Sequence, residues 1–162
     1  MKKMSCIFLF IILLIPSLCF ANYFDQYPKK YVVYDKTEQY KSYLDMDSVA
    51  VRRYDPPYYT IDVMTYSFDY VRQFGMAKQN RYFYNYETQT ISWQVLNMGT
   101  CDEYGNVNIQ YKEEPLMTEL IPLKKYSSGY LAAEFAFTKA YNMPFTIEIQ
   151  QHWNELANTN ER

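Results

Sequence analysis

The chain is poor in the residues on which most catalytic and metal sites depend. Its 162 residues include one histidine, His152, and three cysteines, of which Cys6 and Cys19 lie in an apolar N-terminal stretch. A zinc site usually needs several Cys or His ligands, and no such set is present. The four glycines form no phosphate-binding loop, and no GxSxG nucleophile motif occurs. We therefore expect no metal, no cofactor and no enzymatic activity.

Excess positive charge and long internal apolar runs are lacking as well. The chain has 16 Lys and Arg against 18 Asp and Glu, which gives a formal net charge of −2. A nucleic-acid-binding face needs clustered basic residues, so nucleic acid is not an expected partner. Beyond the N-terminal stretch no apolar run is long enough to cross a bilayer, so we expect no transmembrane span there.

The N-terminal stretch has the pattern of a secretory signal peptide. Lys2 and Lys3 precede the unbroken apolar run Cys6–Ile15, and Cys19 and Ala21 stand at the −3 and −1 positions of a cleavage site. The run is shorter than the about 20 apolar residues of a membrane-spanning helix, which disfavours a membrane anchor. We therefore expect an exported protein that is located in the periplasm, on the cell surface or outside the cell.

Two details of processing and domain organisation follow from this pattern. A lipid-modified Cys19 is a further alternative, although Leu18 stands where a small residue normally precedes such a cysteine. With a signal peptide at 1–21, residues 22–162 form one ordinary domain, with a core at about 31–145 and a C-terminal tail at 146–162. Its only cysteine is then Cys101, which can form no intrachain disulfide. Cys101 can pair between two chains, linking a homodimer, or stay reduced.

Tyrosine is abundant, and the 19 tyrosines suit strands that are buried on one side. After the last of these strands the period changes from two to that of a helix, which Ser127 or Ser128 can cap and which Asn142 and Pro144 end. The sequence therefore predicts an α+β fold, a meandering antiparallel sheet with one C-terminal helix packed on one face. The expected strands are Tyr31–Lys36, Tyr40–Met46, Val49–Tyr54, Tyr58–Val71, Lys78–Tyr86, Ile91–Leu96 and Val107–Tyr111, with a further strand at Thr146–Gln150 and a helical turn at His152–Ala157.

The longest expected strand, Tyr58–Val71, changes its apolar face halfway. The apolar positions are odd-numbered up to Val63 and even-numbered from Met64. Side chains alternate along a strand, so one uninterrupted strand cannot switch faces. We expect a bulge or a sharp bend near Val63 and Met64.

The strands Lys78–Tyr86 and Ile91–Leu96 are expected to form a hairpin. A loop of four residues, or of two, places Tyr86 opposite Ile91, with Tyr84 opposite Trp93 and Tyr82 opposite Val95. Tyr82, Tyr84 and Tyr86 share one face, which either lies exposed as a ligand-binding surface or is buried under the helix. Exposed tyrosine is typical of protein interfaces, so these three residues are the candidate binding site.

Two pairs of like-charged residues have both a structural and a functional interpretation. Asp45 and Asp47 could contribute to a calcium site, or they cap a turn, which their short side chains favour. Arg52 and Arg53 are either a solvated sheet edge or a contact for an acidic partner.

The stretch Tyr43–Val49 (YLDMDSV) and the corner Asp55–Tyr59 (DPPYY) resemble the surface-adhesin protein E family of small exported proteins of host-associated bacteria. The resemblance covers about Tyr31–Phe145. It implies an antiparallel sheet with a helix lying across it, an envelope or surface location, and binding to host extracellular proteins. Members of that family typically join helix and sheet by a disulfide, whereas this helix contains no cysteine.

The function expected from the sequence is that of an exported, non-enzymatic binding module of the cell envelope or surface, similar to an adhesin. Its partners would be host extracellular proteins or other envelope proteins. The alternative is a structural or stress-related envelope protein that has no host ligand and only associates with itself.

Overall fold

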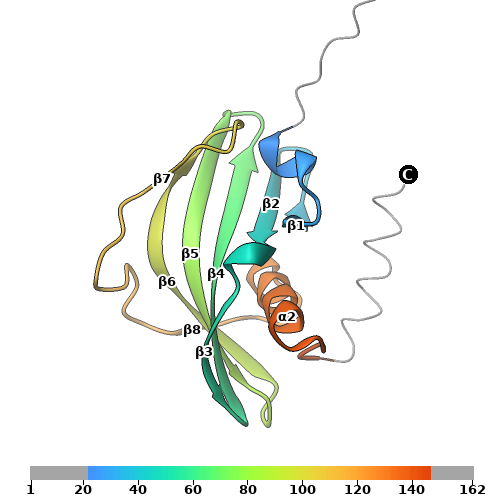
Figure 1. Ribbon diagram of the computed structural model, residues 1–162, viewed down its shortest axis with the longest axis vertical. Helices are drawn as coiled ribbons and strands as arrows, with labels where there is room; N and C mark the ends of the chain where they lie inside the picture. The colour runs from blue at the N-terminus through green and yellow to red at the C-terminus, as the bar shows by residue number, and fades with distance from the viewer. Residues whose placement is uncertain (1–21, 147–162) are drawn as a thin grey trace, which may run out of the picture.

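The computed structural model describes residues 22–146, which form one antiparallel sheet of eight strands and a C-terminal helix (Figure 1). The strand order is β1-β2-β4-β5-β6-β7, with β3 paired to β4 and β8 paired to β6. The α+β architecture expected from the sequence is confirmed. The expected signal peptide at 1–21 and the segments expected beyond Thr146 lie outside the described residues.

The elements follow the tyrosine-rich and β-branched segments of the sequence closely. The helix α2 spans Ser128–Tyr141, and two short 3-10 helices, η1 and η2, span Tyr23–Gln26 and Met46–Ser48. The strands are β1 (Tyr31–Lys36), β2 (Tyr40–Asp45), β3 (Ala50–Asp55), β4 (Tyr58–Asp69), β5 (Phe74–Asn85), β6 (Thr90–Cys101), β7 (Val107–Ile109) and β8 (Ile121–Pro122).

The sheet is covered on both faces, by different elements at different ends. On one face α2 closes a large core, here called the helix core. On the other face η1 closes a smaller one, the N-terminal core, and Figure 1 shows η1 and α2 beside different parts of the sheet. The helix core contains Tyr34, Leu44, Ile61, Val63, Tyr82, Tyr84, Ile91, Tyr130, Ala132, Ala133, Ala136, Phe137 and Phe145. The N-terminal core contains Phe24, Tyr31, Tyr43, Tyr66, Ala77 and Cys101.

The predicted bulge in β4 is wrong. Pairing with β5 continues without a shift from Tyr58 to Asp69. The strand changes its apolar face because its two halves serve different cores, with Val63 in the helix core and Tyr66 in the N-terminal core. The neighbour of β4 on its other side also changes, from β3 along the first half to β2 along the second.

A bulge does occur at this level of the sheet, but in β6. Gln79 of β5 pairs with Asn97 and the next residue, Asn80, pairs with Val95, so Leu96 is the extra residue. Asn80 and Gln79 lie opposite Val63 and Met64 on β4. The bulge therefore lies in β6, two strands away from β4, where the sequence pattern suggested it.

The β5–β6 hairpin forms with a four-residue loop, but its predicted register is wrong by two residues. Tyr84 pairs with Ile91 and Tyr82 pairs with Trp93. The turn starts one residue earlier than expected because the Asn85 side chain accepts hydrogen bonds from the backbone N–H groups of Glu87 and Thr88, at 3.1 and 3.2 Å. A shift of two residues keeps each side chain on its predicted face.

The helix begins and ends where its capping residues predict. The Ser127 hydroxyl accepts a hydrogen bond from the Tyr130 N–H at 3.4 Å, and Asn142 ends the helix in the left-handed conformation with φ 54°. Ala132, Ala133 and Ala136 are fully buried, so the helix backbone lies close to the sheet.

Candidate functional site

Four tyrosines gather at the end of the sheet that lies lowest in Figure 1, where the β3–β4 and β5–β6 hairpin tips project together. The Tyr86 N–H donates to the Pro57 carbonyl at 2.8 Å, which holds the two tips side by side. The set consists of Tyr54 on β3, Tyr59 on β4, Tyr86 after β5 and Tyr141 at the end of α2. We call it the aromatic end surface.

Tyr59 is the centre of the aromatic end surface. Its ring centroid lies 5.6 Å from that of Tyr54, 6.4 Å from Tyr86 and 5.2 Å from Tyr141. Phe137 supports the set from the helix core at 5.4 Å from Tyr59. Tyr54 is 68% exposed and Tyr86 is 37% exposed. The rings are thus held by one another and by the core while part of the set faces solvent, which gives a pre-organised apolar contact surface.

Two hydroxyl groups of this surface, those of Tyr59 and Tyr141, have a raised pKa and stay neutral at physiological pH. Burial raises the pKa of Tyr59, and the neighbouring Tyr54 and Tyr86 raise it further. Burial also raises the pKa of Tyr141, with Tyr59 and Tyr54 as smaller causes. Within residues 22–146 the Tyr141 hydroxyl is buried without a hydrogen-bond partner. The surface therefore combines aromatic rings with hydroxyl groups, of which those of Tyr59 and Tyr141 are held in the neutral form.

Of the three tyrosines predicted as a binding site, only Tyr86 belongs to this surface. Tyr82 and Tyr84 are each 2% exposed because α2 covers them, so the prediction of an exposed face formed by all three is wrong. The Tyr84 hydroxyl donates to the Ala133 carbonyl at 2.8 Å and ties the sheet to the helix. Sequence reasoning missed Tyr54, Tyr59 and Tyr141 as a set because three separate elements bring them together.

Cys101, the candidate for a disulfide between chains, lies in the N-terminal core and is 6% exposed. Burial raises the pKa of its thiol to about 11, with Asp102 as a smaller cause. The backbone at Gly75 approaches so closely that a side-chain carbon there would lie 2.5 Å from the Cys101 sulfur. Disulfide exchange needs an accessible thiolate, so of the two alternatives this environment favours a reduced Cys101 over a link between chains.

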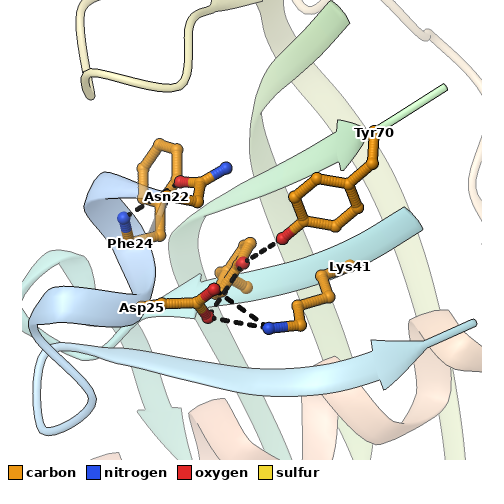
Figure 2. A network of polar contacts seen from close by, with 6 residues as sticks. Asn22, Phe24, Asp25, Lys41 and Tyr70 are labelled. Atoms are coloured by element: carbon orange, nitrogen blue, oxygen red, sulfur yellow. Dashed lines mark hydrogen bonds and ion pairs between the residues drawn. The ribbon is translucent and has the colours of Figure 1, made fainter. Parts of the chain in front are cut away.

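A polar network attaches η1 to the sheet (Figure 2). The Asp25 carboxylate accepts hydrogen bonds from the Lys41 ammonium group, at 2.9 and 3.1 Å, and from the Tyr43 hydroxyl at 3.1 Å. The Tyr43 and Tyr70 hydroxyl groups lie 3.0 Å apart. Burial, together with Tyr70 and Asp25, raises the pKa of Tyr43 strongly. Each of these groups has a partner, so the network serves to hold η1 over the N-terminal core.

The two arginines singled out in the sequence, Arg52 and Arg53, both form ion pairs within the fold. Arg52 donates to Asp62 at 2.7 Å, and Arg53 donates to Asp55. Both arginines are thus paired within the fold, but Asp62 also accepts from Arg81 at 2.6 and 2.8 Å, so its carboxylate is shared by two guanidinium groups.

Asp45, the last residue of β2, has the structural role that the turn-capping interpretation gives it. The Asp45 carboxylate accepts from the Asp47 N–H at 3.0 Å and caps η2. Residues 22–146 contain no group of three or more His, Cys, Asp or Glu that could hold a metal ion. His152 lies outside this range.

A cavity of about 340 Å³ lies along the outer edge of β6, between β7 and the segment that leads to β8. Leu96, Met98 and Leu116 supply apolar lining, and Asn97 supplies an amide. That amide is already used, because it accepts from the Lys112 N–H and donates to Gln79, both at 2.8 Å. Lys112 is the only titratable residue of the lining, so the cavity contains no acid–base pair.

Comparison of the chain with family models, curated proteins and solved structures gives no match in any of the three. The resemblance to the surface-adhesin protein E family therefore stays a prediction. No helix within residues 22–146 is both long enough and apolar enough to span a bilayer.

Proposed function

We propose that the protein is an exported, non-enzymatic binding module that attaches to another protein through the aromatic end surface. The observation that carries this proposal is the gathering of Tyr54, Tyr59, Tyr86 and Tyr141 at one end of the sheet, with Tyr54 mostly exposed. Tyrosine is enriched at interface hot spots because it adds a large contact area with little loss of side-chain entropy.

The chemistry of the surface indicates the kind of partner. The rings are neutral and carry hydroxyl groups, and the exposed charges beside them, Arg53 and Asp55, pair with each other. Such a surface suits a folded protein with an apolar patch better than a strongly charged polymer. The partner that we propose is a host extracellular protein, as the sequence resemblance implies.

Binding of purified chain to a panel of host matrix and serum proteins tests the proposal. The variant Tyr54→Ala should weaken the binding at least about tenfold, the loss of one hot-spot side chain. Tyr104→Ala is the matched control, because Tyr104 is 67% exposed but follows β6 at the other end of the strand. Equal binding by both variants, or no binding to any host protein, would contradict the proposal. Self-association alone would favour the structural envelope protein instead.

A second measurement addresses export. The secreted or envelope fraction of the source cells should contain a chain that begins at Asn22, which N-terminal sequencing detects. A chain that keeps Met1 in the cytoplasm would contradict the export half of the proposal.

A further inference from the structure

Three charged side chains meet on the face of the sheet that α2 does not cover. Asp62 on β4 lies between Ile61 and Val63, which both belong to the helix core, so the Asp62 side chain points to the opposite face. Arg81 on β5 is the cross-strand partner of Asp62. Arg52 reaches the same carboxylate from β3, which among the described strands pairs with β4 alone. We call Arg52, Asp62 and Arg81 the Asp62 cluster.

Arg81 by itself satisfies the buried carboxylate of this cluster. Its Nε donates to Asp62 Oδ1 at 2.6 Å and its Nη2 donates to Asp62 Oδ2 at 2.8 Å, which is the bidentate geometry of a strong guanidinium–carboxylate pair. Hydrogen bonding to Asp62 raises the pKa of Arg81, so this guanidinium group stays charged. Asp62 therefore needs no second arginine to be paired.

Arg52 adds a surplus positive charge to a carboxylate that already has a partner. Its Nε donates at 2.7 Å to Asp62 Oδ2, the same oxygen that accepts from Arg81 Nη2. Two positive charges and one negative charge leave the cluster with a formal net charge of +1. Two guanidinium groups held at one oxygen repel each other, and a second anion would relieve that repulsion.

The cluster also has hydrogen-bond donors to spare. Within residues 22–146, both Nη groups of Arg52 and the Nη1 group of Arg81 make no hydrogen bond. The Arg52 side chain is 53% exposed and the Arg81 side chain 32%, against 4% for Asp62. The buried carboxylate thus holds two guanidinium groups in place while their remaining donors are open to water. Donors that are already positioned lose less entropy when a ligand binds.

We propose that the Asp62 cluster binds an acidic side chain, Asp or Glu, of a partner protein. Arginine presents its donors in a planar fork that matches a carboxylate, and one carboxylate balances the surplus charge. A small free anion fits less well, because small-molecule sites enclose most of their ligand, whereas Arg52 is more than half exposed. A carboxylate presented by a protein surface becomes shielded from water when the two surfaces meet.

The cluster is separate from the aromatic end surface. Tyr59, the centre of that surface, packs against the helix core, whereas Asp62 points to the other face of the sheet. The binding of an acidic side chain therefore does not depend on the proposed function. The structure also changes the pairing that the sequence singled out. Arg53 forms an ion pair within its own strand, and Arg52 is instead joined to Arg81 on another strand.

An NMR titration that follows the arginine Nε–H groups of the full chain tests the proposal. The probe is N-acetylglutamate N-methylamide, and the corresponding glutamine compound at equal ionic strength is the uncharged control. The Nε–H signals of Arg52 and Arg81 should shift and saturate with the glutamate probe only. Arg52→Gln should weaken this binding at least about tenfold. Arg53→Gln removes an exposed guanidinium group from the same strand and should leave the binding unchanged.

Three outcomes of the titration overturn the proposal. The first is the absence of a saturable shift with the glutamate probe, and the second is equal binding by Arg52→Gln and Arg53→Gln. The third is a saturable shift of the same signals with inorganic phosphate but not with the glutamate probe, which would assign the cluster to a free anion.

Thermal unfolding separates a binding role of Arg52 from a structural one. Arg81→Gln deprives the buried Asp62 of its bidentate partner and should lower the melting temperature by several degrees. Arg52→Gln should change the melting temperature by less than about 1 °C, because Arg81 still satisfies both carboxylate oxygens. An equal decrease in both variants would assign Arg52 to the fold and overturn the proposal.

Discussion

The two faces of the sheet are closed in contrasting ways. On one face a 14-residue helix, capped by Ser127 and Asn142, lies on the sheet through three buried alanines. On the other face a four-residue 3-10 helix places Phe24 on the tyrosines of the N-terminal core. A regular helix distributes its attachment over many contacts, whereas η1 is attached through a few: the Phe24 ring, the Asp25 carboxylate, and Tyr23, whose N–H donates to the Glu103 carbonyl. The N-terminal core should therefore be the weaker of the two, and its loss should remain local.

The largest expected effect comes from Phe24→Ala. The Phe24 ring lies 4.8 Å from Tyr66, 5.0 Å from Tyr31 and 5.2 Å from Tyr43, so its loss leaves a cavity in the N-terminal core. We expect a loss of about 3–4 kcal/mol in the free energy of unfolding, measured by urea denaturation.

Hydrogen exchange on the same variant tests whether the damage is local. Amides of η1 and β1 should lose protection while those of α2 keep it. Phe137→Ala is the matched variant in the helix core and should reduce protection across α2 and the sheet together. Equal loss of protection on both faces after Phe24→Ala would show that the two cores form one cooperative unit.

The next largest effect concerns Glu134, the buried charge of the helix core. Glu134→Ala leaves the Phe145 N–H and the Thr146 hydroxyl without their acceptor, at a cost of about 2–3 kcal/mol. Glu134→Gln keeps a carbonyl acceptor and removes the buried charge, so it should cost less than about 1 kcal/mol. Chemical denaturation of both variants at pH 7 measures the difference, and equal losses would contradict it.

The same residue predicts a pH dependence with a definite sign. Burial raises the pKa of Glu134 above its usual 4.5, so the folded protein binds this proton more tightly than the unfolded chain. The resulting stabilisation is complete below pH 4.5 and is lost as the pH rises through the higher folded value. The stability of the wild type relative to Glu134→Gln should therefore fall as the pH is raised above 4.5, which denaturation at a series of pH values up to 7 measures. A constant difference over this range would contradict the raised pKa.

A smaller effect is expected at the attachment of η1. Asp25→Asn removes the ion pair with the half-buried Lys41 but keeps an acceptor for the Tyr43 hydroxyl. The cost should be about 1 kcal/mol, and most of it should disappear when Lys41 is replaced as well. Denaturation of the single and double variants measures it, with the exposed Glu38→Gln as control. If Asp25→Asn remains equally destabilising after Lys41 is replaced, the stabilisation by Asp25 comes from its hydrogen bond with Tyr43 and not from the ion pair.

The smallest effect on stability is expected at the aromatic end surface. Tyr54 is largely exposed, so Tyr54→Ala should change the free energy of unfolding by less than about 0.5 kcal/mol. A loss of partner binding by this variant can then be attributed to the surface. A loss of several kcal/mol would show instead that Tyr54 supports the fold.

Local features of the fold could be predicted because nearby residues decide them. Ser127, Asn142 and Pro144 mark the ends of α2, and composition locates strands β1 to β7, but it misses β8 and the outer halves of β5 and β6. The hairpin was predictable, but its register was not, since the Asn85 side chain moves the turn by one residue. The tyrosine-rich strands were recognisable in the sequence, but which of their tyrosines the helix would cover was not.

An antiparallel sheet, a late helix and the ends of that helix follow from local sequence, because they depend on alternation, propensity and capping within a few residues. Long-range packing, in contrast, decided that β4 serves two cores without a bulge, that Tyr82 and Tyr84 are buried, and that Glu134 lies inside. It also decided that Tyr54, Tyr59, Tyr86 and Tyr141 meet. Each of these depends on which element covers which face of the sheet, and such contacts join residues that are far apart in the chain.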